Sequence, residues 1–184
     1  MEREGWVVWI TGLPGSGKSV IARALQKLLL ERNVRTQILS SDEFRKYLTP
    51  RPTYSQAERD ILYSSLGFVV SLLAKNGINV IIDATGNLRK YREDCRAMVQ
   101  KFAEVYLKCA PEICVKRETT RIDTMHAPRA IYERAMSGKA PTVPGVGSPY
   151  EEPLNPEVVV ESDKTDPDRC AQAIMEKLNV FLLK

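Results

Sequence analysis

One stretch near the start of the sequence carries residues whose types and spacing suggest chemistry. Residues 12–19 read GLPGSGKS, follow the apolar run at 6–10, and precede a helical pattern that begins VIARALQ. This is the G-x-x-x-x-G-K-[ST] pattern in the strand, loop and helix context that it requires. Its glycines let backbone N–H groups turn inward around an anion at the positive end of a helix. The pattern predicts a loop that binds a nucleoside triphosphate; the alternative is a glycine-rich turn without a ligand.

The residues of this loop have distinct predicted roles. Lys18 would reach the β- and γ-phosphates as a point charge, and the Ser19 hydroxyl would ligate the Mg²⁺ that bridges them. ATP is the expected co-substrate and Mg²⁺ the expected cofactor. The predicted nucleotide-binding residues of the loop are Gly12, Leu13, Pro14, Gly15, Ser16, Gly17, Lys18 and Ser19.

Two further residues follow the second predicted strand, TQILS at 36–40, in the stretch SDEFRKYL. In a parallel sheet this strand ends at the same edge as the phosphate loop, so Asp42 and Arg45 would project toward the γ-phosphate. Asp42 could accept the proton of an attacking hydroxyl, and Arg45 could hold an anionic acceptor. The alternative is that Asp42 only favours a helix N-terminus, because Ser40 to Glu43 form an S-x-x-E capping box.

Asp83 ends the third apolar strand, NVIID at 79–83. A carboxylate at this place could bind the Mg²⁺ shell through water or hold the substrate, whereas strand-end acids also cap the next turn. Arg117 follows the fourth strand in VKRE, where it would lie against the adenine or the phosphates of the nucleotide; a solvated helix end is the alternative.

The elements that position these residues alternate between strand-length apolar runs and helical patterns. Further strands are predicted at 104–108 and 157–161, a long helix from about Ser55 to Asn76-Gly77, and a last helix that opens with Asp166-Pro167. This alternation predicts an α/β fold with a five-stranded parallel sheet and helices on both faces.

Length and composition limit the function classes. The 184 residues fit a single domain over 1–184, and 43% hydrophobic with 27% charged residues is ordinary for a globular protein. The net charge of +4 selects neither a small anionic substrate nor nucleic acid. The four cysteines show no C-x-x-C pair or zinc spacing, and no run has the length of a membrane span. We therefore expect a cytoplasmic protein with no membrane partner.

Residues 119–156 interrupt the regular pattern with six prolines and three glycines. This composition predicts an irregular lid or binding loop, with a plain structural excursion as the alternative. Arg121, Arg129 and Arg134 lie in it, and closure could bring one of them onto the transferring phosphoryl group. His126 is the only histidine of the chain and is expected to be solvated.

At SPYEEPLNPEVVV (148–160) the sequence resembles the adenylyl-sulfate kinase family, whose members carry a similar S-P-Y-E-x-P-x-N-P segment. The match extends over nearly the whole chain. The stretch at 9–25 resembles the family's first strand and P-loop, LSSDEFR at 39–45 resembles L-D-G-D-x-x-R, and YSQAERDILYSSLG at 54–67 resembles F-S-x-x-D-R-x-E-N-I-R-R-x-G.

The resemblance implies a P-loop kinase-like three-layer fold and phosphorylation of the 3′-hydroxyl of adenylyl sulfate by ATP. It also implies that Asp42 is the base and that Arg45 and Arg59 contact the acceptor's sulfate or phosphate. Family members are commonly dimers, so a homodimer is one expectation.

The sequence departs from the family pattern at several positions. Leu62 and Ser64 replace an asparagine and an arginine, Val143-Pro144-Gly145 replaces F-T-G, and residues 119–128 are an apparent insertion. Two other functions therefore remain open. One is a kinase for another hydroxyl, on a polynucleotide or an aminoacyl-tRNA, although the chain lacks an evident basic groove for nucleic acid. The other is a nucleotide-binding module without catalysis.

Overall fold

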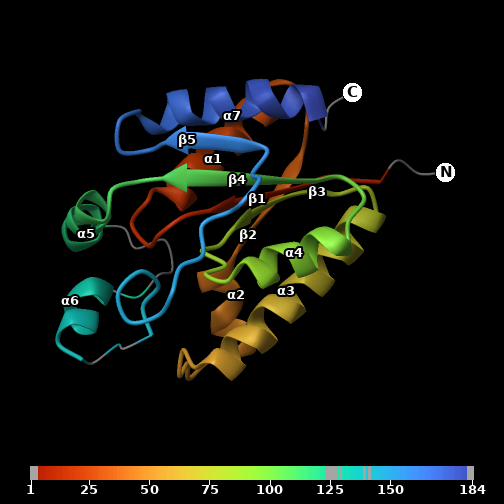
Figure 1. Ribbon diagram of the computed structural model, residues 1–184. Coiled ribbons are helices and arrows are strands. Elements are labelled where there is room, and N and C mark those ends of the chain that lie inside the picture. Colours follow the sequence, from red (N-terminus) through yellow and green to blue (C-terminus); the bar gives the residue numbers. More distant parts are fainter. Residues whose placement is uncertain (1–3, 123–127, 129, 139, 141, 182–184) are drawn as a thin grey trace.

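The computed structural model describes residues 4–122, 128, 130–138, 140 and 142–181, and its strands form one parallel sheet in the order β2-β3-β1-β4-β5 (Figure 1). The elements in chain order are β1 (Val7–Thr11), α1 (Lys18–Glu31), β2 (Thr36–Ser40), α2 (Ser41–Leu48), α3 (Gln56–Lys75), β3 (Asn79–Asp83), α4 (Arg89–Ala97), β4 (Phe102–Lys108), α5 (Pro111–Thr120), α6 (Ile131–Met136), β5 (Val158–Glu161) and α7 (Pro167–Phe181). The five-stranded parallel sheet predicted from the sequence is confirmed.

Helices cover both faces of the sheet, because its central strands are apolar on both sides. On one face, α1 and α7 pack over Val8 and Ile10 of β1. On the other face, α3 and α4 pack over Val7 and Trp9 of the same strand. Figure 1 shows the two helical layers, with α1 and α7 on one side of the sheet and α3 and α4 on the other. β1 is therefore buried along its whole length, and it holds the start of the P-loop in a fixed place.

The ends of the predicted helices lie where the sequence placed them. The hydroxyl of Ser55 accepts a hydrogen bond from the backbone N–H of Glu58 at 3.3 Å, which caps the start of α3. The same helix ends at Asn76, and Gly77 follows with a φ of 77°. Since that left-handed conformation favours glycine, the Asn-Gly pair was a sound signal for the helix end.

The cap of α3 gives a first test. We expect Ser55→Ala to lower the free energy of unfolding by about 1 kcal/mol, because the N–H of Glu58 loses its partner. Ser64 lies exposed in the middle of the same helix, so Ser64→Ala is a matched control that should be neutral or slightly stabilising. Urea denaturation followed by circular dichroism measures both. Equal stability of the two variants would contradict the capping role.

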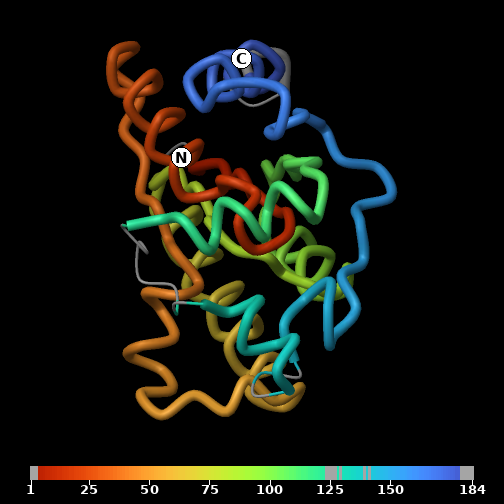
Figure 2. The backbone as a smooth tube through the Cα atoms, turned by 90° about the vertical axis from the view of Figure 1, so that its left-hand side faces the viewer, coloured from red at the N-terminus to blue at the C-terminus, as the bar shows by residue number. Residues whose placement is uncertain are grey.

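Segment 119–156 is more regular than its composition predicted. Helix α5 continues to Thr120, and α6 lies inside the segment. Tyr132 explains why α6 forms, since its ring is buried in a small apolar cluster with Cys109 and Cys114 and its hydroxyl donates to the carbonyl of Pro14 at 2.7 Å. This packing stabilises α6 despite the prolines and glycines of the surrounding segment, which disfavour a helix. Figure 2 looks onto the carboxyl edge of the sheet and shows α5 and α6 in front of it.

Two further features concern the cysteines and the apolar character of the helices. All four cysteines are buried free thiols, as the absence of paired spacing suggested. Within the described ranges, no helix combines the length and the apolar character that crossing a membrane requires.

Candidate active site

The P-loop runs from the end of β1 to the start of α1 and lines a cavity of about 630 Å³. Its backbone requires glycine at two points. Gly15 has a φ of 81°, and a Cβ there would lie 2.3 Å from the carbonyl oxygen of Cys114, while Gly17 has a φ of 94° and directly precedes α1. Of the predicted loop residues, Pro14 to Ser19 line the cavity, whereas Gly12 and Leu13 lie behind it.

Lys18 is the first residue of α1, and its ammonium group is held over the loop. Its Nζ donates to the carbonyl oxygens of Gly12 and Leu13, each at 3.0 Å. Burial lowers the pKa of Lys18, while the charges of Asp83 and Asp42 act in the opposite direction. The nearby hydroxyl of Ser16 is buried and has no hydrogen-bond partner within the described part of the chain. The loop thus offers a buried cation and an unused hydroxyl to a ligand.

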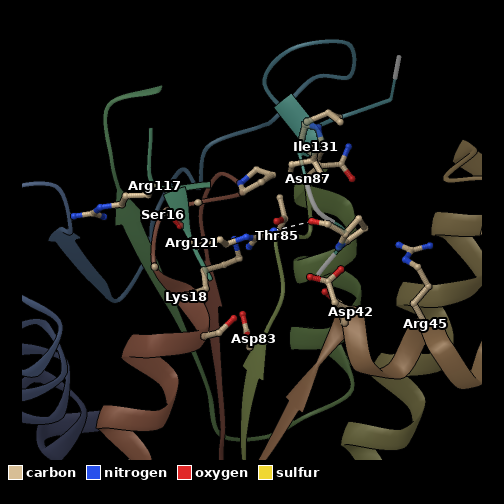
Figure 3. Close-up of a pocket in the computed structure, with 18 of the residues that line it drawn as sticks. Ser16, Lys18, Asp42, Arg45, Asp83, Thr85, Asn87, Arg117, Arg121 and Ile131 are labelled. Atoms are coloured by element: carbon tan, nitrogen blue, oxygen red, sulfur yellow. Dashed lines mark hydrogen bonds between the residues drawn. The ribbon is translucent and has the colours of Figure 1, made fainter. Parts of the chain in front are cut away.

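Asp83 lies at the end of β3, beside the P-loop. The residue is 6% exposed. Burial raises the pKa of its carboxyl group, while the Lys18 charge and the nearby Ser19 hydroxyl act to lower it. Figure 3 shows Lys18, Asp83 and Asp42 around the same part of the cavity. The parallel sheet has brought together three residues that lie far apart in the sequence.

Asp42 lies in the first turn of α2, where an acidic residue favours the helix N-terminus, and it also lines the cavity, so both suggested roles are compatible with its position. Ser40, not Asp42, caps α2, because its hydroxyl accepts from the N–H of Glu43 at 3.5 Å. Asp42 lines the cavity, and no ion pair engages its carboxylate among the residues that the structure describes. Its carboxylate is thus available to a ligand.

Arg45 also lines the cavity, but its charge already has a partner. It forms a buried ion pair with Glu58, and its guanidinium lies 4.8 Å from the centre of the Tyr54 ring. Burial works to raise the pKa of Glu58, yet hydrogen bonds from Thr53 and Tyr54 and the Arg45 charge lower it overall. Glu58 therefore organises the loop before α3, and Arg45 stiffens the same wall of the cavity.

Arg59 differs from Arg45 because its charge is not neutralised. Its guanidinium donates to the carbonyl of Thr142 and to the Ser148 hydroxyl, the latter at 3.4 Å. It is 6% exposed, and in the described ranges it has no carboxylate partner. Burial lowers the pKa of Arg59, which reflects the cost of holding the charge there. A buried cation of this kind at a cavity wall favours an anionic ligand.

Arg117 also lines the cavity, and Figure 3 shows it on the side away from Arg45. It donates to the carbonyl of Ser162 at 2.7 Å, so it is held against the loop after β5 rather than free in solvent. Arg121 and Arg134 complete the cationic lining. His126, Arg129 and Lys139 lie outside the described residues.

Comparison with known proteins identifies the family to which the chain belongs. The family model described as adenylylsulphate kinase matches residues 4–161. An adenylyl-sulfate kinase of Gloeothece citriformis is 33% identical over 97% of each chain. The chain belongs to the adenylyl-sulfate kinase family. The structure of the Mycobacterium tuberculosis APS kinase CysC in complex with AMPPNP and APS has a TM-score of 0.84 at 30% identity, over 96% of this chain and 98% of that one. A hexameric APS kinase from Thiobacillus denitrificans matches 97% of this chain and 29% of its own, with a TM-score of 0.68 at 29% identity.

The segment SPYEEP at 148–153, which carries the resemblance to the family, contacts residues at the carboxyl edge of the sheet. The carboxylate of Glu151 accepts from the N–H of Arg89 at 2.8 Å, and its N–H donates to the carbonyl of Asn87. The hydroxyl of Tyr150 lies 3.1 Å from that of Thr11 at the end of β1. These contacts attach the end of segment 119–156 to the carboxyl edge of the sheet.

The departures from the family pattern have unequal consequences in this fold. Leu62 is fully buried in the core, and Ser64 is exposed on α3. Neither residue lines the cavity, whereas Val143 does. Two departures therefore alter the wall of the site: the missing aromatic ring at Val143, and the apparent insertion at 119–128, which contributes Arg121 and Pro128 to the lining.

Sequence reasoning missed some residues of this site. Thr85 and Asn87 line the cavity from the loop after β3, and Tyr63 lines it from α3. The first two could have been found, since they follow Asp83 at the same sheet edge. Tyr63 carried no signal, because a tyrosine at helical spacing is usually a core residue.

Proposed function

We propose that this chain transfers the γ-phosphoryl group of ATP to the 3′-hydroxyl of adenylyl sulfate, giving 3′-phosphoadenylyl sulfate and ADP. One observation carries the proposal: Arg59, a buried and unneutralised cation, faces the same cavity as the P-loop, with Asp42 also on its wall. A site for two anionic nucleotides needs cations at both ends and a proton acceptor between them. The family relationship supports adenylyl sulfate as the second nucleotide.

Each of these residues has a separate proposed role in the reaction. The P-loop N–H groups and Lys18 hold the β- and γ-phosphates, and Arg117 lies on the nucleotide side. Asp42 takes the proton of the 3′-hydroxyl as that oxygen bonds to the γ-phosphorus, and the bond to the bridging oxygen of ADP breaks. Arg59 binds the sulfate or phosphate of the acceptor. Arg45 orders Tyr54 and Glu58 on the same wall. In the described part of the lining, six cationic side chains face two acidic ones, which suits two polyanionic substrates.

The residues beside Lys18 fit a magnesium ion. Mg²⁺ in nucleotide sites is held by one or two protein oxygens together with substrate phosphates. The Ser19 hydroxyl and the Asp83 carboxylate supply such oxygens, and both residues line the cavity beside Lys18. When bound, the ion would neutralise charge on the phosphates of ATP.

The domain organisation, the compartment and the association of copies follow from the same observations as further proposals. We propose that residues 1–184 act as one kinase domain in which segment 119–156 is the lid. The buried free thiols fit a reducing compartment such as the cytoplasm. Association of copies, for which a homodimer is the simplest form, is supported by the hexameric relative.

Arg59 tests the acceptor half of the site. We expect Arg59→Ala to raise the KM for adenylyl sulfate about 10- to 100-fold and to change the KM for ATP little, because a charge-assisted hydrogen bond contributes about 1.5 to 3 kcal/mol. Arg23 on α1 is exposed and outside the cavity, so Arg23→Ala is the matched control. Steady-state kinetics with each substrate varied in turn give both constants.

Two outcomes would count against the proposal. Equal increases in both KM values would place Arg59 in the nucleotide site. Purified protein should also be assayed for ATP consumption with adenylyl sulfate, adenosine, a short RNA and no acceptor. Turnover with another acceptor and none with adenylyl sulfate would replace the proposed reaction by that of another hydroxyl kinase.

A further inference from the structure

The chain places a second cation next to the P-loop lysine. Arg121 directly follows α5 and lines the cavity, and Figure 3 shows its side chain beside Lys18. Burial lowers the pKa of Lys18, and the charge of Arg121 contributes in the same direction. Two cations this close repel each other unless anions neutralise them, and Arg121 forms an ion pair with Glu118. Asp83 and Asp42 offset part of the Lys18 charge, but they lie on the sheet side of the cavity.

Arg121 is held by one end of its guanidinium. Its Nη2 donates to the carbonyl of Pro128 at 2.8 Å and lies 3.4 Å from a carboxylate oxygen of Glu118. Its Nε is buried and has no partner within the described part of the chain. An unpaired N–H of a charged group is costly, more so than that of a neutral one. Glu118 Oε2 is likewise buried without a partner among the described residues, so the pair is held in place without being fully hydrogen-bonded, and the arrangement fixes the direction of the Arg121 side chain at the cavity wall.

Glu118 holds the Arg121 side chain in this position. Its side chain is 1% exposed, and one carboxylate oxygen serves both Arg121 and the backbone N–H of Ile131 at 3.2 Å. Ile131 opens α6, whose Tyr132 donates to the carbonyl of Pro14 in the P-loop. A continuous set of contacts therefore connects Arg121 to the loop that holds the phosphates.

The other described arginines that line the cavity near the P-loop are less suited to contact a phosphoryl group beside Lys18. Arg117 is tied to the carbonyl of Ser162, and Arg134 is exposed on α6. Arg121 also lies in residues 119–128, the stretch without a counterpart in the family pattern. A role for Arg121 in the reaction would therefore be specific to this chain and would not follow from the family pattern.

We infer that Arg121 is a catalytic residue that donates to the γ-phosphoryl group in the transition state, and that Glu118 is its positioning residue. The inference rests on the kinase half of the proposed function and not on the identity of the acceptor. An arginine placed beside the transferring group stabilises the charge that spreads over its oxygens, and its loss reduces kcat rather than ATP affinity.

The test compares Arg121→Ala and Arg121→Lys with Lys116→Ala, which removes an exposed cation from α5 outside the cavity. We expect Arg121→Ala to lower kcat about 100-fold with a KM for ATP within about threefold of the parent. Arg121→Lys should recover part of kcat, and added guanidinium chloride at millimolar concentration should partly restore Arg121→Ala. Lys116→Ala should match the parent. A melting curve for each variant separates catalysis from folding.

A second readout makes the result independent of the acceptor. ADP with aluminium fluoride mimics the transferring phosphoryl group, and we expect Arg121→Ala to bind it at least tenfold more weakly while binding ADP alone as the parent does. If the parent shows no turnover with adenylyl sulfate but this difference persists, the acceptor was wrong and the role of Arg121 stands. An unchanged kcat, or a loss confined to the KM for ATP, would overturn the inference.

Discussion

Replacing Lys18 by alanine is expected to lower kcat at least about 1000-fold while the protein stays folded. The ammonium group of Lys18 lies over the P-loop, held by the carbonyls of Gly12 and Leu13. Without it, charge that develops between the β- and γ-phosphates loses its nearest protein cation. The side chain lies at the start of α1 beside the cavity, so its removal takes little from the apolar core. Initial-rate measurements with saturating ATP give the change in kcat.

A matched lysine shows whether the loss is specific. Lys27 is exposed on the same helix, and Lys27→Ala should retain the parent rate. Circular dichroism and a melting curve should show that both variants remain folded. A folded Lys18→Ala protein with the parent's kcat would rule out the P-loop as the phosphate site.

Asp42→Asn is expected to reduce kcat about 1000-fold and to leave ATP binding nearly unchanged, since an amide keeps the shape of the side chain and cannot take a proton. The structure sharpens this prediction, because Ser40 and not Asp42 caps α2. Stability should therefore change little. Titration calorimetry with ATP and steady-state kinetics measure the two properties separately.

Glu43 provides the control for Asp42. It is the next residue of α2, it is acidic, and it is exposed. Glu43→Gln removes the same charge from the same turn and should keep kcat within about twofold of the parent, as surface substitutions away from a site do. If Asp42→Asn were as active as Glu43→Gln, another group would have to be the proton acceptor.

Arg121, Lys18 and Asp42 line the cavity from two sides. Arg121 approaches the P-loop from segment 119–156, while Lys18 and Asp42 approach from the sheet edge. Such a division is typical of kinases that exclude water by covering the phosphates. We expect double variants of Arg121 and Lys18 to be less harmful than the product of the single effects, since both would act on one phosphoryl group.

The sequence by itself determined the parallel sheet, the P-loop and the ends of the main helices. These features follow from local rules. Continuous apolar runs form strands that are buried on both faces, glycine allows the loop conformation, and Ser55 and Gly77 end α3 through their own backbone chemistry. The sequence also placed Asp42 and Asp83 at the correct sheet edge, because parallel strands end on one side.

Only the tertiary structure decided what each charged residue does there. Arg45 and Arg59 are equal candidates in the sequence, yet Glu58 forms an ion pair with the first, and the second is buried with no carboxylate partner in the described part of the chain. In the same way, Glu118 and Tyr132 place Arg121 beside Lys18 through contacts between elements that no local pattern encodes. The free energy of a charge depends on the partners and the water around it, and packing between distant segments sets both.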